Sequence, residues 1–381
     1  MNPKLKMGIV GGGGIGTVHQ MAARLDGKIE LVAGAFSSTA ERSKRSGEQL
    51  GLHPSRVHDD YRTMAAEEAE LPADERIDFV SIVTPNHLHS PVAKAFLEAG
   101  FNVVCDKPMT FDLAEALELR GLVKKSGKVF ASTYNYTGYP MVKEAREIVR
   151  RGELGKVLKV VTEYSQGWLL NPLEAKGQEQ VWRNDPSKAG ATGCLSDIGT
   201  HVKHLARYVT GLEIDELCAD FTKFGAGQRL EDDANLLVHY KGGARGIIHC
   251  SKISAGEENR LNIRAYGTHA SLEWDQEHPN ELILKYPDAS RRTLRRGNEY
   301  VSGTAKRVTR LVRGQPEGFI EAFANLYLEA ARAIRAETSG QSIPEGCDFP
   351  NVEDGVTGMA FVETAVESAT NGGAWTKMKG A

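Results

Sequence analysis

The chain of 381 residues has few cysteines, no long apolar run and almost no excess charge. Its five cysteines are scattered and form no Cys-x-x-Cys pair, which argues against a disulfide or zinc framework and favours reduced thiols in the cytoplasm. Glycines interrupt the apolar stretch near the N-terminus, so it predicts neither a signal peptide nor a membrane span. A net charge of −3 without a long basic run gives no reason to expect a nucleic-acid or membrane partner.

What is present is an ordinary globular composition, with 41% hydrophobic and 25% charged residues, in a length that predicts two domains. In the first part, short apolar strands alternate with helices, which is typical of right-handed crossovers and a parallel sheet. We expect strands at 7–10, 29–36, 77–83, 101–105 and 129–134, and helices near 15–25, 40–50, 91–99 and 113–125.

The pattern changes after about residue 155, where β-rich stretches predict a mostly antiparallel sheet. These stretches are 156–166, 216–225, 233–254, 259–274 and 281–295, with a hairpin turn at Gly242-Gly243. Helices are expected at about 199–210, 317–336 and 352–370. The basic segment 295–315 predicts a mobile surface loop, with a specific anion site as the alternative.

A glycine cluster follows the first strand and opens a helix, and it fits the pattern Gly-x-Gly-x-x-Gly. Gly11 permits the tight turn, Gly13 lets the backbone approach a pyrophosphate, and Gly16 lets the helix pack on the strand. The N–H groups at the helix N-terminus then face the phosphates. We therefore expect a dinucleotide held by Gly11, Gly13, Gly14, Ile15 and Gly16.

The end of the second strand does not distinguish NAD from NADP. An acidic residue usually holds the adenosine ribose of NAD at this position, but here the chain has Phe36, Ser37 and Ser38. The two serines and the nearby Arg42 suit a 2′-phosphate, and they equally suit a plain ribose. Both cofactors stay open on these residues.

The third and fourth strands each end in polar residues that a parallel sheet would direct toward its ligand crevice. Thr84, Asn86 and His87 follow the third strand, where they either contact the nicotinamide or form a capped turn before the next helix. Lys107 follows the fourth strand, where a lysine either hydrogen-bonds a substrate hydroxyl and stabilises an alkoxide or lies at the surface.

Asp197 and His201 are four residues apart, so a helix would place them on one face. A carboxylate beside an imidazole can fix its tautomer and raise its basicity, as proton removal from an alcohol requires. The alternative is an N-cap followed by a core histidine. His204 raises the idea of a metal site, but neither a cysteine nor a second carboxylate lies at a suitable spacing, and we expect no metal.

Taken together, the ordered motifs resemble the Gfo/Idh/MocA family of glucose–fructose oxidoreductase, inositol dehydrogenase and their relatives. The resemblance covers nearly the whole chain and rests on residues 11–16, 84–87, 106–108 and 193–201. The family usually has Glu-Lys-Pro where this chain has Asp106-Lys107-Pro108, a conservative change. Residues 181–186 and 316–323 further resemble the branch of levoglucosan dehydrogenase and related sugar dehydrogenases, which favours NAD.

The resemblance implies an α/β protein with a Rossmann domain over 1–134 and, over 135–381, an α/β domain with a large open sheet that binds substrate and commonly mediates oligomers. It implies that His201 is the general acid/base, Asp197 its partner or a substrate ligand, and Lys107 the hydroxyl anchor. It also places Asn135 near the cofactor and Tyr136 near the substrate. Trp168 and Trp182 are expected to stack on a sugar face and Arg183 to bind a hydroxyl, or all three are ordinary core and surface residues.

We therefore expect a cytoplasmic, homo-oligomeric dehydrogenase, a dimer or tetramer, that oxidises a secondary hydroxyl of a sugar, anhydrosugar or cyclitol with NAD, NADP not being excluded. The alternatives are a carbonyl reductase, a redox-neutral enzyme with a permanently bound dinucleotide, and a dinucleotide-responsive sensor without catalysis.

Overall fold

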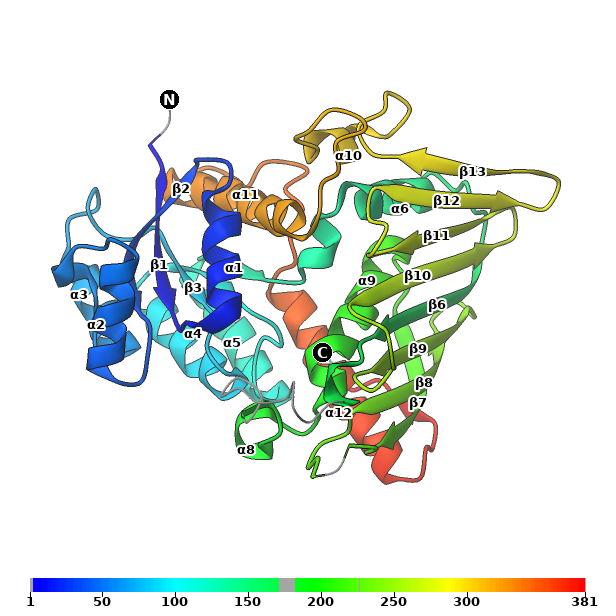
Figure 1. Cartoon of the computed structure of the whole chain (residues 1–381), viewed down its shortest axis with the longest axis horizontal. Coiled ribbons are helices and arrows are strands. Elements are labelled where there is room, and N and C mark those ends of the chain that lie inside the picture. The colour runs from blue at the N-terminus through cyan, green and yellow to red at the C-terminus, as the bar shows by residue number, and fades with distance from the viewer. Residues whose placement is uncertain (1–2, 171–181, 226, 381) are drawn as a thin grey trace. The chain divides into compact units, whose positions relative to one another are not determined.

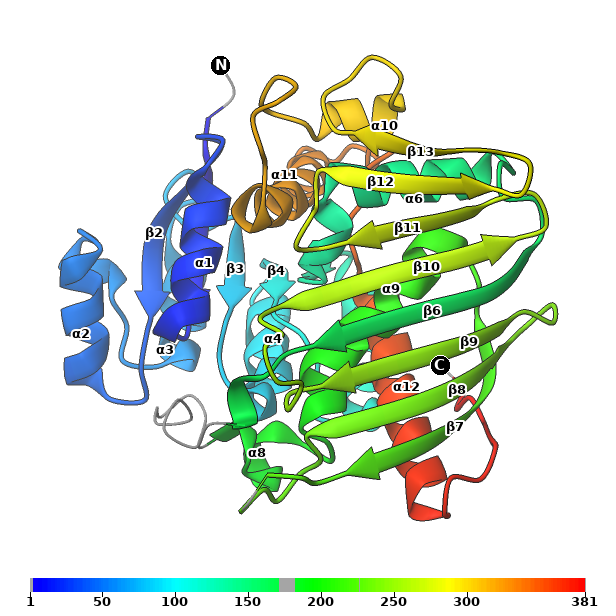
Figure 2. The same ribbon diagram turned by 45° about the vertical axis from the view of Figure 1, so that its right-hand side comes forward.

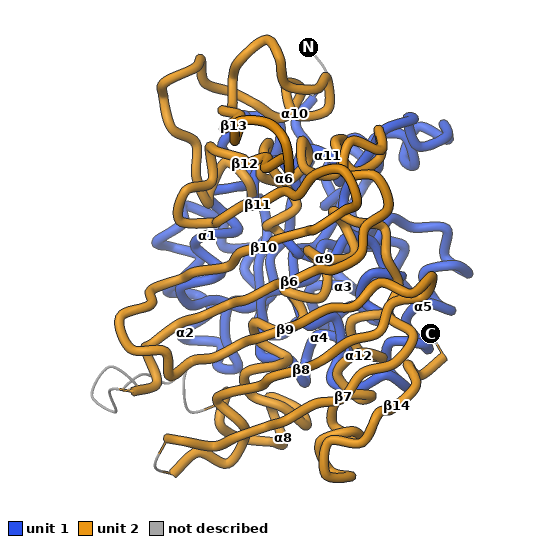
Figure 3. Tube along the Cα trace, turned by 90° about the vertical axis from the view of Figure 1, so that its right-hand side faces the viewer, with its two compact units in different colours: residues 1–134, 323–356 blue, residues 135–322, 357–381 orange. Residues whose placement is uncertain are grey.

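The computed structural model describes residues 3–170, 182–225 and 227–380. The chain packs as two compact units, one of residues 1–134 and 323–356 and the other of residues 135–322 and 357–381 (Figure 3). The segment 323–356, which the sequence assigned to the second domain, thus packs within the first unit. No helix in the described ranges is long and apolar enough to cross a bilayer.

The first unit is built on a parallel five-stranded sheet of order β2-β1-β3-β4-β5, which confirms the predicted parallel sheet. Most of its strand residues are buried, and such strands read as continuous apolar runs in the sequence. The strands are β1 (Leu5–Val10), β2 (Ile29–Ala35), β3 (Phe79–Ile82), β4 (Asn102–Cys105) and β5 (Phe130–Ser132).

The strand order reverses between β1 and β3, because β1 leads to β2 on one side and β3 leads to β4 on the other. Right-handed crossovers therefore place α1 and α4 on opposite faces of the sheet (Figure 1). The helices of this unit are α1 (Gly13–Arg24), α2 (Ala40–Gln49), α3 (Tyr61–Glu70), α4 (His89–Glu98), α5 (Leu113–Ser126) and most of α11 (Phe319–Thr338).

The second unit contains a nine-stranded sheet of order β13-β12-β11-β10-β6-β9-β8-β7-β14. Among the strand pairs of the described residues in this sheet, β6–β9 alone is parallel, so the mostly antiparallel prediction is confirmed. Gly242 and Gly243, both at positive φ, turn β8 into β9 as expected. The strands are β6 (Val157–Ser165), β7 (Ile214–Thr222), β8 (Asp233–Tyr240), β9 (Arg245–Ser251), β10 (Arg260–Gly267), β11 (Ser271–Asp275), β12 (Glu281–Tyr286), β13 (Ala289–Arg295) and β14 (Thr376–Lys377).

Helices cover one face of this sheet, and the core of the unit lies between them (Figure 2). Trp274 and Tyr139 are among its largest fully buried side chains. Strand residues alternate between this core and the opposite face, where Leu237 and Ile247 are exposed. The helices here are α6 (Pro140–Arg150), α8 (Pro186–Ala189), α9 (Thr200–Thr210), α10 (Gly303–Arg307) and most of α12 (Val352–Thr370).

The segment 295–315, expected to be a mobile surface loop, is anchored instead. Arg296 and Glu317 form an ion pair in which both side chains are buried, with Nη1 and Oε1 2.9 Å apart. The same carboxylate accepts hydrogen bonds from the backbone of Arg310 and Leu311. A buried carboxylate is stable only when it is paired, and its partners here hold both ends of the segment together.

Candidate active site

In the first unit, the glycine loop lies where the sheet changes direction. Gly11 has φ +103°, and a Cβ there would come within 2.7 Å of the Val83 carbonyl oxygen and 2.9 Å of the Thr84 nitrogen. Only glycine fits this close approach between the ends of β1 and β3. A Cβ on Gly16 would be 3.5 Å from the Val83 side chain, so α1 lies close to β3.

The start of α1 suits a phosphate. Gly12 lies at the N-cap position of the helix, and as a glycine it has no side chain with which to cap the first N–H groups. Thr84, whose backbone nitrogen lies against Gly11, has a buried hydroxyl oxygen that forms no hydrogen bond within the described part of the chain. A glycine at the N-cap, which leaves room for a phosphate at the helix N-terminus, and this unpaired hydroxyl of Thr84 fit a dinucleotide at the strand ends.

The residues after β2 lie in a polar surface turn. Ser37 Oγ accepts a hydrogen bond from the Thr39 backbone, Ser38 is exposed, and Arg42 is exposed in the first turn of α2. None of Phe36, Ser37 and Ser38 carries a carboxylate, and the two serine hydroxyls and the Arg42 guanidinium lie within one short stretch that also contains Glu41.

The turn after β3 contains a short 3₁₀ helix. Asn86 begins a 3₁₀ turn, η2 (Asn86–Leu88), and is 7% exposed. The next helix, predicted near Pro91, starts at His89 with Leu88 at its N-cap position. His89 has its two ring nitrogens 2.7 Å from the Pro108 carbonyl oxygen and 2.8 Å from that of Thr84, so it links the turns after β3 and β4.

Lys107 follows β4, and its neighbour Asp106 fixes the backbone there. Asp106 Oδ1 accepts hydrogen bonds from the Lys107 backbone nitrogen at 2.8 Å and from Thr133 Oγ1 at 2.6 Å. Burial acts to raise the pKa of Asp106, but His19, Lys107 and the Thr133 hydroxyl lower it further than burial raises it. Asp106 is therefore a carboxylate that ties the lysine's strand tip to the end of β5.

A buried polar group lies behind this carboxylate. His19 Nδ1 is 2.7 Å from Tyr327 Oη, and Tyr327 Oη is 2.8 Å from Ser81 Oγ. His19 Nε2 is 3.9 Å from Asp106 Oδ1. Burial lowers the pKa of His19 to about 4, although Asp106 acts in the opposite direction, so the imidazole is neutral near pH 7.

In the second unit, Asp197 lies in a π-helical turn, η5 (Leu195–Gly199), and His201 lies in the first turn of α9 that follows. The sequence predicted a plain helix from about residue 199 and missed this turn. Single π turns are rare in helices overall, and those that occur are often found at functional sites. His201 is 6% exposed, whereas the Asp197 side chain is 23% exposed.

Two cations face the Asp197 carboxylate. Lys252 Nζ is 2.8 Å from Asp197 Oδ2, and its side chain is only 3% exposed. Arg183 Nε is 3.8 Å from the same oxygen, and its guanidinium lies over the Trp182 ring, 4.6 Å from the centroid. Sequence reasoning named Arg183 but missed Lys252.

A chain of hydrogen bonds begins at Tyr136, whose ring contacts that of His201. Tyr136 is buried, with its ring edge-on to His201 at 4.8 Å between centroids, and its hydroxyl bonds that of Tyr164 at 2.5 Å. The Tyr164 hydroxyl donates to Asn259 Oδ1 at 2.7 Å, and Gln166 Nε2 donates to the same oxygen at 2.9 Å. Burial raises the pKa of both tyrosines, so both phenols are neutral hydrogen-bonding groups.

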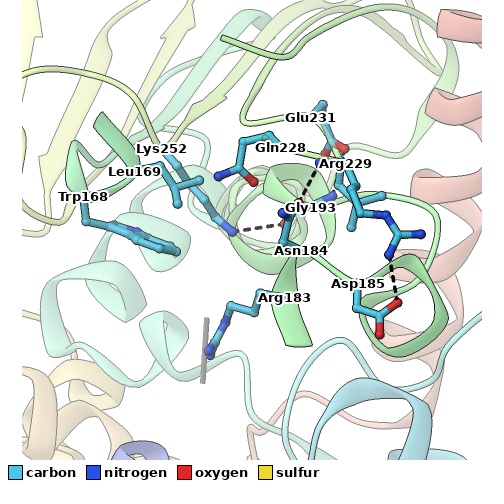
Figure 4. Close-up of a pocket in the computed structure, with 11 residues that line it drawn as sticks. Trp168, Leu169, Arg183, Asn184, Asp185, Gly193, Gln228, Arg229, Glu231 and Lys252 are labelled. Carbon is cyan, nitrogen blue, oxygen red and sulfur yellow. Dashed lines mark hydrogen bonds and ion pairs between the residues drawn. The ribbon is translucent and has the colours of Figure 1, made fainter. Parts of the chain in front are cut away.

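This chain ends at a pocket of about 400 Å³ (Figure 4). Trp168 in η4 (Trp168–Leu170) donates its Nε1–H to Gln166 Oε1 at 2.9 Å, which fixes the ring at one side of the pocket. Lys252 and Arg183 line it as well, and Arg229 and Asp185 form an ion pair on the far side. An aromatic plane with several charged groups is a suitable lining for a polyhydroxylated ring.

The structure thus gathers Tyr136, Trp168, Arg183, Asp197 and His201 within the second unit, while Lys107 and the glycine loop belong to the first. Trp182 lies directly after residues 171–181, which are outside the described ranges. Asn135 begins the second unit, and its Nδ2 is buried without a hydrogen bond among the described residues.

Comparison with protein families matches two profiles. Residues 5–134 match the oxidoreductase family with an NAD-binding Rossmann fold, and residues 142–273 match the GFO/IDH/MocA C-terminal domain. Together they cover well over half of the chain, and the first agrees with the dinucleotide site built above.

Several known proteins are similar over most of their length. An uncharacterized oxidoreductase of Bacillus subtilis, YfiI, is 36% identical over 98% of this chain and 97% of its own. A solved inositol dehydrogenase homologue from Azotobacter vinelandii, complexed with NADH and myo-inositol, is 36% identical with a TM-score of 0.93 and covers 98% of both chains. Levoglucosan dehydrogenase of Pseudarthrobacter phenanthrenivorans is 27% identical over 77% of this chain and 78% of its own.

Proposed function

This chain belongs to the GFO/IDH/MocA oxidoreductase family, and we propose that it is an NAD-dependent dehydrogenase that oxidises a secondary hydroxyl of a cyclitol or sugar. The observation that carries the proposal is that Asp197 in the π turn and His201 in the following first turn of α9 lie near a polar, tryptophan-lined pocket, with Asp197 ion-paired to two residues of its lining, Arg183 and Lys252. The cyclitol is placed first because the Azotobacter homologue complexed with myo-inositol is more similar to this chain than levoglucosan dehydrogenase is.

NAD, when bound, supplies the acceptor for the hydride that leaves the substrate carbon. The start of α1 would hold its pyrophosphate and the turn after β2 its adenosine ribose, while the ends of β3 and β4 and the start of the second unit would hold the rest. The residues proposed for these contacts are Gly11, Gly13, Gly14, Ile15, Gly16, Ser37, Ser38, Arg42, Thr84, Asn86, His87, Lys107 and Asn135.

Side chains of the protein remove the proton from the substrate hydroxyl and stabilise the charge that develops on its oxygen. His201 accepts the hydroxyl proton, and the Asp197 carboxylate stabilises the imidazolium that results. Lys107 donates a hydrogen bond to the same hydroxyl and stabilises the developing alkoxide. That Lys107 and His201 act on one hydroxyl is part of the proposal, and kinetics on the two single variants and the double variant test it.

The substrate ring would lie on Trp168, with Arg183, Trp182 and Tyr136 contributing further contacts. The polar groups that line the pocket can form hydrogen bonds with the hydroxyls of a ring, whereas an apolar substrate would leave them unpaired. This favours a polyol over a hydrophobic alcohol as the substrate. We also propose that the protein works in the cytoplasm as a homo-oligomer, a dimer or tetramer that uses the exposed face of the nine-stranded sheet.

Initial rates of NADH formation test the proposal, measured over a panel of inositols, monosaccharides and levoglucosan with NAD⁺ and NADP⁺ in parallel. We expect activity with NAD⁺ on at least one cyclitol or sugar. Activity only in the direction of keto-sugar reduction would replace it with a reductase, and cofactor binding without turnover in either direction would favour a sensor.

A further inference from the structure

Lys252 lies immediately after β9 and has an unusual position for a lysine. Its side chain is 3% exposed, whereas lysines are almost never fully buried unless they are paired. Its Nζ lies 2.8 Å from Asp197 Oδ2, donates to the Gly193 carbonyl oxygen at 3.1 Å, and is 5.3 Å from the centre of the Trp168 ring.

These contacts place the ammonium group beside Asp197, which is proposed for catalysis, and Trp168, which is proposed for substrate binding. The Gly193 carbonyl lies shortly before the π turn, so it fixes the ammonium close to the turn's backbone. The Trp168 face provides a second favourable neighbour for a cation. The remaining contact is with Asp197 itself, at the distance of a charge-assisted hydrogen bond.

Among the described residues, the other charged and titratable groups near Asp197 affect its carboxylate less than Lys252 does. Arg183 is 3.8 Å away and 31% exposed, so water screens its charge. Glu231 accepts hydrogen bonds from the backbone nitrogens of Gly193 and Leu195, so its carboxyl group faces the start of the π turn. Burial raises the pKa of Glu231. The phenols of Tyr136 and Tyr164 are neutral, and His201 lies four residues further on.

We propose that Lys252 is a positioning residue that keeps Asp197 ionised and holds its carboxylate in place for His201. A buried ammonium 2.8 Å away favours the charged form of the acid and restricts its rotamers. The catalytic consequence rests on the proposed function, but the effect on Asp197 ionisation does not. No sequence pattern marks this lysine, since it lies far along the chain from the Asp–His segment.

The direct test is the titration of Asp197 in protein labelled with ¹³C at the aspartate side-chain carboxyl carbon, with its NMR signal assigned from its loss in Asp197→Asn. In Lys252→Met we expect the titration midpoint to rise by about one pH unit or more, because an adjacent opposite charge lowers a carboxyl pKa by about 1–3 units. Lys252→Arg, which keeps the charge, is expected to stay closer to the wild type.

Lys203→Met is the matched control. Lys203 is also buried, lies on α9, and donates to Thr357 Oγ1 at 2.7 Å. Its replacement shows whether the loss of another buried lysine shifts the Asp197 titration midpoint. We expect no change in the Asp197 midpoint in this variant. An unchanged midpoint in Lys252→Met, or an equal rise in both variants, would overturn the proposal.

Kinetics supply the second readout once a substrate is known. In Lys252→Met a loss of kcat beyond that of the wild type is expected over the pH range in which Asp197 becomes protonated, because the neutral acid no longer stabilises the His201 imidazolium, and activity should recover as the carboxyl ionises. If no polyol is oxidised by the wild type, the proposed function fails, and the carboxyl titration still decides the role of Lys252.

Discussion

At the scale of single residues, the strand tip that carries Lys107 is more constrained than a surface lysine would require. Asp106 binds the Lys107 backbone and the Thr133 hydroxyl, and His89 links the carbonyls of Thr84 and Pro108. These bonds fix the backbone from which the Lys107 side chain leaves. Such support is expected for a group that must meet a substrate within a fraction of an ångström.

Replacing Lys107 by Ala is therefore expected to lower kcat by about 100-fold or more while changing NADH affinity only a few-fold, because the lost hydrogen bond strengthens as charge develops. Steady-state rates and NADH fluorescence titration measure the two effects. Lys94→Ala is the control, since that lysine on α4 pairs with the exposed Glu118. Wild-type turnover in Lys107→Ala would contradict the assignment.

His19 gives a prediction about pH. Its pKa is about 4 in the folded protein and near 6.5 when unfolded, so between these values the unfolded state binds more protons. The free energy of unfolding must then rise with pH across this window and fall on acidification, by at most about 1.4 kcal/mol per pH unit.

In His19→Gln this contribution is absent, while the amide can still bond the Tyr327 hydroxyl. The stability of the wild type relative to the variant should therefore be lower at pH 5 than at pH 7.5. Urea denaturation at both values measures the difference, and a pH-independent difference would show that His19 is not buried in its neutral form.

At the scale of elements, the turn between β1 and α1 depends on one backbone conformation. Gly11→Ala is expected to weaken NADH binding strongly and to lower Tm, since the residue combines φ +103° with a Cβ position 2.7 Å from the Val83 carbonyl oxygen. Gly27→Ala also has positive φ, at +63°, but has open space around its Cβ.

The pair therefore separates backbone strain from the steric clash at the loop. Fluorescence titration should show a loss of NADH affinity in Gly11→Ala only. Thermal unfolding should show a lower Tm in both variants, with the smaller decrease in Gly27→Ala, where backbone strain acts without a steric clash. Equal affinity in the two variants would place the dinucleotide elsewhere.

The π turn is the element that most affects the second unit's chemistry. It changes the register between Asp197 and the helix carrying His201, so the simple four-residue rule for one helical face described the pair only approximately. Gly199 ends the turn where a Cβ would come within 2.7 Å of Leu195 and 3.0 Å of Cys250. Close packing under this turn explains the small residue there.

At the scale of the whole molecule, the described helices leave one face of the nine-stranded sheet uncovered. Leu237 is 50% exposed and Ile247 36%, and the two are directly paired across β8 and β9. On the same face, Tyr266 is 38% exposed and Arg264 pairs with Glu163. An apolar centre with a polar surround is typical of an interface between protein chains.

We therefore expect Leu237→Arg to lower the mass of the particle measured by light scattering, because it places a charge at the centre of this face. Leu117→Arg on α5, where the leucine is 36% exposed, is the control and should leave the mass unchanged. A monomeric wild type, or an oligomer that tolerates Leu237→Arg, would show that this face is not the interface.

Much of the fold was predictable because its signals are local. Buried parallel strands are apolar runs, half-buried strands alternate, and the glycine pattern marks the start of α1, so both sheets were expected near their observed positions. The Asp–His segment was recognisable for the same reason, since its members are close in sequence. Helices α3 and α6 were missed, as was the ordered segment 295–315, whose anchor is the buried Arg296–Glu317 pair.

The sequence by itself determined the alternation of elements, the NAD-binding loop and the family to which the chain belongs. Tertiary structure decided which distant side chains meet: Lys252 at Asp197, Tyr164 and Asn259 behind Tyr136, and α11 beside the parallel sheet. The reason is physical. Periodicity and turn chemistry act over a few residues, whereas ion pairs and strand order arise only when packing brings distant parts of the chain within a few ångströms of each other.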